Sequence, residues 1–244
     1  MAGLFLVAAA GGEARRLSEP GHWDSRGVWS PDGREVACVS DRAGAPDLWR
    51  MPVAGGQASR LTDGGSLEAL GDWSPDGRTL VYSGDAAGGL DLWTIPAGGG
   101  EPRRLTDFDG DEAAPRWAPD GSWIVFASIA HGRADLWTVP AGGGRATRLT
   151  DDPALDVSPA VSPDGQWVAF VSDRGGRTDL WAVPSAGGPA VRLTDDDAVE
   201  GSPDWAPDGS VLVFSRHPAG GGEATGSDLR VLELPALEPD PRRR

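Results

Sequence analysis

Residues 73–106 read WSPDGRTLVYSGDAAGGLDLWTIPAGGGEPRRLT. This stretch combines four signals for short β-strands that are joined by tight turns. Ser-Pro-Asp-Gly is typical of a type I turn, because proline presets φ at the second turn position and glycine suits the fourth. The apolar run Thr79–Ser83 and the Asp-Leu-Trp segment at Asp91 both favour strands, and the Arg-Leu-Thr segment at Arg104 supplies a further short strand.

The same pattern recurs along the chain with a period of 44 residues. The [Ser/Ala]-Pro-Asp-Gly turn begins at Ser30, Ser74, Ala118, Ser162 and Ala206, and the Arg-Leu-Thr/Ser segment begins at Arg16, Arg60, Arg104, Arg148 and Arg192. Asp-Leu-Trp begins at Asp47, Asp91, Asp135 and Asp179, and a fifth copy, Asp228-Leu229-Arg230, comes five residues late. A period of this length is typical of propeller blades, because one small sheet cannot bury both faces unless its neighbours stack against it.

We therefore predict an all-β fold, a β-propeller of about five four-stranded blades, as one domain over residues 1–237. Closure is expected from Glu13–Leu17 as the outer strand of the last blade, which would remove an open edge. One third strand, Leu4–Val7 or Leu229–Leu234, would then be surplus, and an open arc is the alternative. The Pro- and Arg-rich tail 238–244 is expected to be disordered.

The apolar N-terminus, MAGLFLVAAA, is interpreted as a repeat strand, because a shift of 44 residues places Gly3-Leu4-Phe5 on Asp47-Leu48-Trp49. A signal peptide is the weaker interpretation, since no Lys or Arg precedes the apolar run. The default expectation for location is then cytoplasmic.

Charge and cysteine content restrict the partners. The 244 residues carry a formal net charge of −15 with a pI near 4.5, so the chain should repel nucleic acid and anionic lipid. Cations, basic peptides or basic protein surfaces are favoured. No apolar run is long enough to span a bilayer, and the single cysteine, Cys38, excludes an internal disulfide.

An acidic residue recurs at one register in the loop that leads into each first strand, which we name the lead-in loop. The five are Asp24, Glu68, Glu112, Asp156 and Glu200. Because first strands line the channel of a propeller, these carboxylates would form a ring at its mouth, and Ca²⁺ or a basic peptide would suit such a ring. The competing interpretation is structural: each carboxylate accepts backbone N–H bonds from its own or the next loop. Trp23, beside the first acid, is a candidate exposed contact residue.

These motifs together resemble the TolB-like propeller repeats, a group similar to WD repeats. The match lies in Trp-Ser-Pro-Asp-Gly, Ser-Asp-Arg-x-Gly, Asp-Leu-Trp, Gly-Gly and Arg-Leu-Thr-Asp, and it covers nearly the whole chain. The resemblance implies relatives of three sorts: TolB itself, the gating propeller of prolyl-oligopeptidase-like serine peptidases, and free-standing bacterial propellers. It also implies that many relatives are exported.

Three functions stay open at this point. The first is a non-catalytic scaffold that binds a protein or peptide at the loop face and channel mouth. The second is the gating propeller of a peptidase, although the sequence contains no Gly-x-Ser-x-Gly nucleophile motif. The third is a metal-dependent hydrolase or lyase at the acidic ring. No nucleophile–base set, metal cluster or phosphate loop is recognised, so we expect neither a catalytic residue nor a cofactor other than Ca²⁺.

Overall fold

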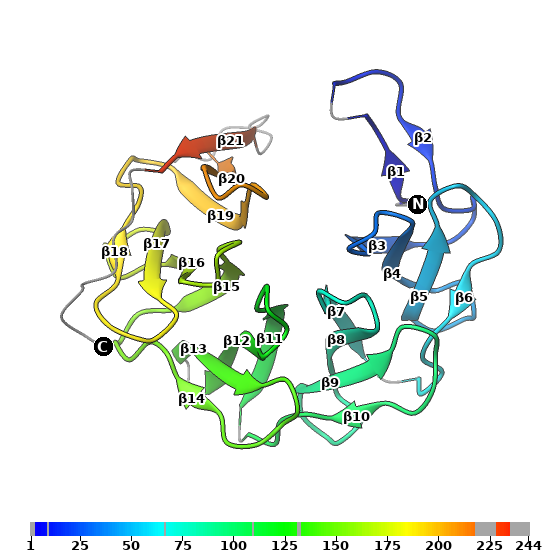
Figure 1. Ribbon diagram of the computed structural model, residues 1–244, viewed down its shortest axis with the longest axis horizontal. Coiled ribbons are helices and arrows are strands. Elements are labelled where there is room, and N and C mark those ends of the chain that lie inside the picture. The colour runs from blue at the N-terminus through cyan, green and yellow to red at the C-terminus, as the bar shows by residue number, and fades with distance from the viewer. Residues whose placement is uncertain are drawn as a thin grey trace. The chain divides into compact units, whose positions relative to one another are not determined.

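The computed structural model describes residues 3–8, 10–65, 67–108, 110–130, 133–217 and 228–234. The tail for which disorder is expected lies outside these residues. All regular structure in the described residues is β-structure, arranged as five blade sheets and one N-terminal hairpin (Figure 1). The chain divides into two compact units, residues 1–115 and 116–244, and each is described by itself.

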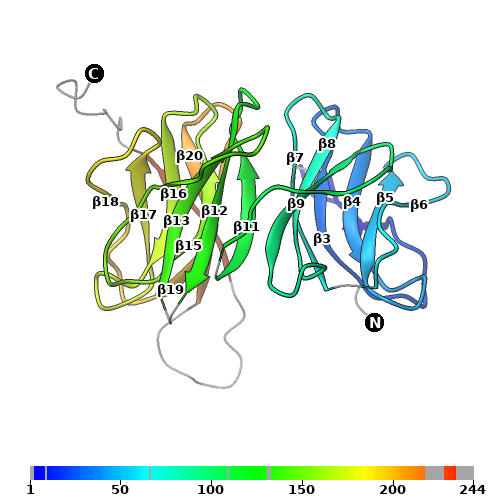
Figure 2. The ribbon, with the colours of Figure 1, turned by 90° about the horizontal axis from the view of Figure 1, so that it is seen from below.

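Each blade begins with two longer antiparallel strands. The first strands are β3 (Asp24–Trp29), β7 (Glu68–Trp73), β11 (Asp111–Trp117), β15 (Asp156–Val161) and β19 (Val199–Trp205). The second strands are β4 (Glu35–Ser40), β8 (Thr79–Gly84), β12 (Trp123–Ala130), β16 (Trp167–Ser172) and β20 (Val211–His217). In the side view of Figure 2 the blade strands within each unit run side by side, as expected of small sheets that pack face to face.

Two further strands complete four of the blades. The third strands are β5 (Asp47–Pro52), β9 (Asp91–Pro96), β13 (Arg133–Pro140), β17 (Asp179–Pro184) and β21 (Asp228–Glu233). The fourth strands are short: β6 (Ser59–Arg60), β10 (Arg103–Arg104), β14 (Thr147–Arg148) and β18 (Val191–Arg192). The last sheet, β19–β20–β21, has three strands among the described residues.

The N-terminal segment pairs with itself. It forms a hairpin in which β1 (Phe5–Leu6) pairs with β2 (Arg15–Arg16), with Phe5 opposite Arg16. The physical reason is local: β1 and β2 are joined by a short loop, so their pairing costs little chain entropy. The N-terminus is thus a strand, as the repeat predicts, but closure by it is not shown.

The Ser-Pro-Asp-Gly segments form the expected turns. In the first blade the N–H of Gly33 donates to the carbonyl of Ser30 at 2.9 Å, and the Ser30 hydroxyl lies 2.7 Å from Asp32. Gly33 has φ of 69°, a left-handed conformation that glycine adopts without strain. These bonds close the first hairpin of the blade and fix its register.

Apolar side chains from adjacent blades share one core within each unit. In the first unit Val39 and Leu48 of one blade pack with Leu80 and Ile95 of the next. In the second unit Val125 and Leu136 pack with Val168, Phe170 and Val183 in the same way. Full burial of one such side chain stabilises the fold by roughly 1.5–3 kcal/mol. This sharing explains why the strands are apolar on both faces.

The first strands β3, β7, β15 and β19 each contain a bulge that sequence reasoning did not foresee. Four non-glycine residues at one register have φ near 50°: Arg26, Ala114, Ser158 and Ser202. The pairing with the second strand shifts beside Arg26, Ser158 and Ser202, as between Ser25 and Val28. In the second blade the shift falls at Gly71. A bulge bends the strand locally, directly after the lead-in loop.

Candidate functional site

The five acidic residues of the lead-in loops are all buried. Each stands at the first or second position of its first strand, and the exposed fractions are 2% for Asp24, 7% for Glu68, 0% for Glu112, 0% for Asp156 and 3% for Glu200. Asp24, Glu68 and Glu112 belong to the first unit, and Asp156 and Glu200 to the second. A buried carboxylate must be compensated by donors, so the partners of each one show what it does.

The three glutamates bind groups of the preceding repeat. Glu68 accepts the Thr62 hydroxyl and the backbone N–H of Leu48 at 3.2 Å. Thr62 in turn accepts the same Leu48 N–H at 2.9 Å. The other two copies are Glu112 with Thr106 and Leu92, and Glu200 with Thr194 and Leu180. Each glutamate therefore joins its own blade to the blade before it.

The two aspartates also receive a hydrogen bond at the register of Thr62, from Ser18 and Thr150, but they add ion pairs within their own blades. Asp24 lies 2.8 Å from the guanidinium of Arg42, and Asp156 lies 2.6 Å from that of Arg174. Each arginine also packs its guanidinium over a third-strand tryptophan, 4.9 Å from the ring centroid in both blades. Such a contact adds a cation–π attraction to the ion pair.

Side-chain length and the presence of arginine vary together along the chain. The register of Arg42 and Arg174 holds Ala86 and Ala130 in the two blades that carry Glu68 and Glu112. An aspartate occurs where the arginine is present, and a longer glutamate occurs in these blades where it is absent. The longer side chain also reaches the leucine backbone N–H of the preceding blade, which takes the place of the guanidinium as a donor.

Burial sets the pKa values of these groups, and hydrogen bonds modify them. The pKa of Glu112 is raised to about 7: burial is the largest cause and Asp91 adds to it, against the bonds from Thr106 and Leu92 and the charge of Arg104. Burial also raises the pKa of Glu200 and of Asp156, the latter against the bond from Arg174. At Asp24 burial raises the pKa, but bonds from Ser40, Arg42 and Ser18 outweigh it and leave the pKa lowered.

A row of exposed apolar residues lies directly beside these carboxylates. The residue before the acid is Trp23, Leu67, Leu155 or Val199 in four blades, and it is exposed by 42%, 58%, 43% and 46% respectively. In the remaining blade this register holds the exposed Asp111. We name the four residues the apolar row. Trp23 is exposed in the structure, and its role as a contact residue stays a prediction.

The backbone of three members of the apolar row is held by aspartates from the loop between the second and third strands, and Val199 is paired with His217 of β20. The N–H of Trp23 donates to Asp41 at 2.8 Å, and the N–H of Leu67 donates to Asp85 at 2.7 Å. The N–H of Leu155 donates to Asp173 at 2.9 Å. The carbonyls of Trp23 and Leu67 accept the backbone N–H of the same aspartates, both at 3.2 Å. These side chains are therefore presented to solvent from an ordered main chain.

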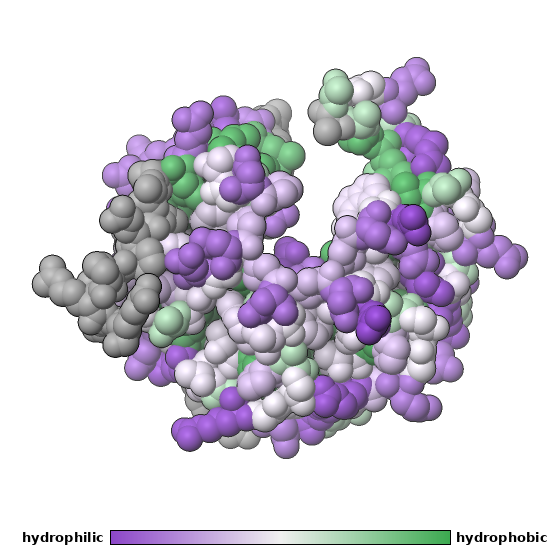
Figure 3. Space-filling model, in the orientation of Figure 1, coloured by the Kyte–Doolittle hydropathy of each residue, from purple (hydrophilic) through white to green (hydrophobic). Residues whose placement is uncertain are grey.

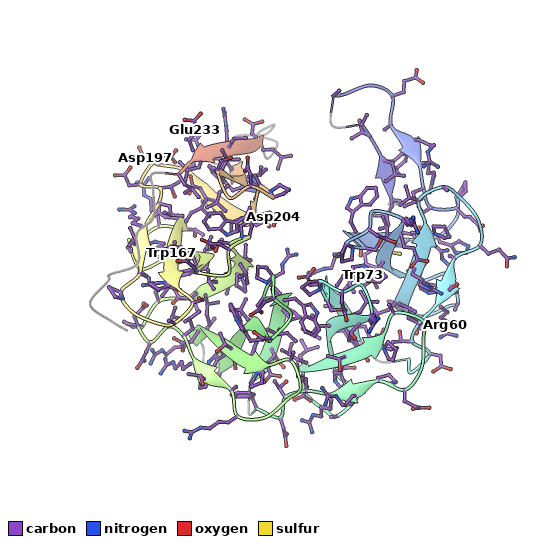
Figure 4. The ribbon with its side chains drawn as sticks, in the orientation of Figure 1. Arg60, Trp73, Trp167, Asp197, Asp204 and Glu233 are labelled. Carbon is purple, nitrogen blue, oxygen red and sulfur yellow. The ribbon has the colours of Figure 1, made fainter. Side chains whose placement is uncertain are left out.

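Acidic side chains surround the apolar row. In the second unit a shallow pocket of about 440 Å³ beside Leu155 is lined by Asp152, Pro153, Ala154, Asp173 and Arg174. Arg174 is bound at 2.7 Å to Asp152 as well as to Asp156, so its charge is already neutralised. Further along the chain Asp197, at the rim of this unit in Figure 4, is 92% exposed and forms an ion pair with Arg177. The surface around the row is thus apolar and acidic together.

Neither a metal cluster nor a membrane span is found in the part of the chain that the structure describes. No three His, Cys, Asp or Glu side chains of these residues are grouped so as to hold a metal ion. No helix there has the length and apolar character needed to cross a bilayer. The five acidic residues each bind side-chain or backbone groups of their own and the preceding repeat. A role for them as a ring that binds Ca²⁺ or a peptide stays a prediction.

The family model described as TolB beta propeller domain matches residues 1–107 and 92–234. The chain belongs to this family. The fold prediction, five blades of a TolB-like β-propeller, is therefore confirmed by the repeats and by the family match. Family membership alone identifies no partner.

Solved structures of three kinds resemble the chain. Putative TolB from Agrobacterium tumefaciens is 24% identical with a TM-score of 0.78, over 91% of this chain and 81% of that one. A prolyl endopeptidase is 16% identical with a TM-score of 0.68, over 95% and 38%. Oligogalacturonate lyase from Vibrio parahaemolyticus is 18% identical with a TM-score of 0.72, over 94% and 69%. At these identities the likeness shows the fold alone.

Proposed function

We propose that this TolB-family propeller is a non-catalytic scaffold that binds a protein or peptide through the apolar row and the acidic loops around it. The observation that carries the proposal is the repeated exposure of Trp23, Leu67, Leu155 and Val199, the first three on a main chain held by aspartates. Repeat proteins commonly use one face of the array for binding, and variation at a fixed register adapts that face to its partner.

The physical chemistry of the row favours binding over stability. The exposed part of a Leu or Trp side chain does not stabilise the folded state, because it stays in water. Covering that part with a partner removes apolar area from water and therefore favours binding. The aspartate bonds fix the backbone beforehand, so less conformational entropy is lost when a partner docks.

Charge indicates the class of partner. The chain carries a net charge of −15, and Asp41, Asp85 and Asp173 stand directly at the row. A segment that combines basic and apolar side chains would pair with both features, and its association would weaken as salt rises.

The test uses a fluorescent peptide that alternates lysine and leucine, with a peptide that alternates glutamate and leucine as its control. The protein variant replaces all four residues of the apolar row by serine, and a matched variant replaces Val191, an apolar residue that is 45% exposed on β18. We expect the lysine peptide to bind wild type and Val191→Ser alike, and the row variant to bind about tenfold or more weakly. Equal affinity of all three proteins, or equal binding of both peptides, would refute the proposal.

Two other interpretations stay predictions. Gating of a hydrolase partner predicts that a separate hydrolase domain co-purifies with the chain. Metal-dependent hydrolysis or elimination at the acidic residues predicts an activity that EDTA removes. Titration calorimetry of Ca²⁺ against wild type and the Glu68/Glu112/Glu200→Gln variant tests the ion site, and equal heats would remove it.

A further inference from the structure

Third and fourth strands are joined by an ion pair in each of the four complete blades. The third-strand aspartate lies 2.7–2.8 Å from the fourth-strand arginine. The pairs are Asp47–Arg60, Asp91–Arg104, Asp135–Arg148 and Asp179–Arg192. Figure 4 shows Arg60 on the outer strand of the first blade. The aspartate is buried in every case, so the ion pair is a regular feature of a four-stranded blade.

Two hydrogen bonds made by the backbone of the third-strand leucine accompany the ion pair. The leucine after the aspartate accepts the N–H of the fourth-strand leucine, as in Leu48 with Leu61 at 2.8 Å. Its own N–H donates to the following hydroxyl, as in Leu48 with Thr62 at 2.9 Å. This leucine is 0% exposed in all four blades: Leu48, Leu92, Leu136 and Leu180.

The last sheet presents the same third-strand motif without these partners. Leu229 is 78% exposed and Val231 is 64% exposed. The Asp228 side chain is 65% exposed, and its ion pair is with Arg230 in the same strand at 3.3 Å. Figure 3 shows apolar surface over this sheet. Within the described residues, β21 therefore has an open edge on its outer side.

The N-terminal hairpin forms the hydrogen bonds of a fourth strand but lacks the ion pair. Leu17 donates to the carbonyl of Leu4 at 2.9 Å, and the Leu4 N–H donates to the Ser18 hydroxyl at 3.0 Å, so the fourth-strand bonds are formed. The ion pair is not formed there, because Gly3 stands in the register of the aspartate. Arg16 instead donates to the backbone carbonyls of Ser18 and Glu19.

We propose that β21 binds the Arg16–Ser18 segment of a second copy of this chain as its fourth strand. Arg16 would pair with Asp228, Leu17 would donate to Leu229, and the Leu229 N–H would donate to Ser18. Each hydrogen bond that the segment gives up with Leu4 is thereby formed again, and an ion pair is gained. Exchange of one terminal strand between identical chains is a low-cost route to an assembly, because it repeats contacts for which the sequence is already adapted.

Charge complementarity, in addition to the exposure of β21, points to this occupant. Arg16 is the member of its series that has no carboxylate partner among the described residues, and Asp228 is the member of its own series that has no fourth-strand arginine there. In the structure the Arg16 strand is paired with β1, so binding to β21 requires that this pairing opens. This surface is distinct from the apolar row, so the inference stands or fails independently of the proposed function.

The experiment exchanges the two charges between chains. Light scattering with size exclusion should give wild type at least twice the chain mass of 25.4 kDa. Arg16→Asp and Asp228→Arg should each reduce the mass to that of one chain, because like charges then face each other. An equimolar mixture of the two variants should restore the assembly, because each interface of the mixed pair again joins opposite charges.

Restoration on mixing is the deciding result, since only contacts between chains can produce it. A competing peptide of residues 13–19 should dissociate the wild-type assembly, and the same peptide with Arg16→Glu should not. The inference is overturned if wild type has the mass of one chain at every concentration, if either single variant keeps the wild-type mass, or if the mixture stays at one chain mass.

Discussion

Replacement of Glu112 by glutamine should change the pH dependence of stability in a direction that the structure dictates. The carboxyl group is 0% exposed, accepts a bond from Thr106, and has Asp91 nearby but no arginine in its own blade's register. Burial raises its pKa from 4.5 to about 7. Glutamine keeps the size and the acceptor oxygen of the side chain but cannot ionise.

The sign follows from proton linkage. Between pH 4.5 and about 7 the folded chain holds a proton on Glu112 that the unfolded chain has released, so stability falls as pH rises through this window. One pKa unit corresponds to about 1.4 kcal/mol, so the full shift is worth at most about 3 kcal/mol. The Glu112→Gln variant lacks this loss. Relative to wild type it should gain up to about 3 kcal/mol between pH 4 and pH 8.

The measurement is urea unfolding of both proteins at a series of pH values, reported as the difference in free energy of unfolding. All other titrating groups are common to the two chains and cancel in that difference. Asp24→Asn is the matched control, because the pKa of Asp24 is lowered and Arg42 neutralises it. Its stability contribution is complete above the unfolded pKa, so this variant should be destabilised by a constant amount between pH 5 and pH 8. A flat difference curve for Glu112→Gln would refute the reasoning.

Two further substitutions test the blade itself, both by urea unfolding at neutral pH. Arg192→Met leaves Asp179, whose side chain is 1% exposed, as an uncompensated buried charge, and should cost about 3 kcal/mol or more; an unchanged midpoint would show that the ion pair is dispensable. Gly71→Ala places a Cβ within 2.8 Å of the Pro115 carbonyl oxygen, so it should cost about 2 kcal/mol. Gly98→Ala meets nothing within 4 Å and should be close to neutral, so equal effects of the two would contradict the steric argument.

The fold could be predicted because its determinants are local and repeated. The turn at Ser30–Gly33 closes through its own residues, and the buried leucine of Asp-Leu-Trp has the same neighbours in each blade. A period of 44 residues then extends one correct blade to the others. Closure does not follow from the repeat in this way, because it depends on which partner pairs with the Arg15–Arg16 strand, and closure stays a prediction.

The candidate site was predicted only in part. The register of the acidic residues is plain in the sequence, but whether a carboxylate faces a channel or a neighbouring blade depends on χ angles and on the bulge after it. Nothing in the identities of Arg26 and Ser158 signals a positive φ. The apolar row did leave a signal, since Leu67, Leu155 and Val199 share the register of Trp23, but such residues at a strand entrance usually indicate packing.

Some blades carry an aspartate with an arginine, and others carry a glutamate without one. These two arrangements constrain how such an array can be rearranged by recombination. Asp24 and its Arg42 are 18 residues apart within one repeat, whereas Glu68 depends on Thr62 from the repeat before. A crossover between residues 24 and 42 would separate a carboxylate from its counterion or set a glutamate against an arginine. A breakpoint after the arginine and before the next threonine, such as between Arg42 and Thr62, keeps both arrangements intact. We therefore expect most functional duplications and engineered chimaeras to have their breakpoints in that interval.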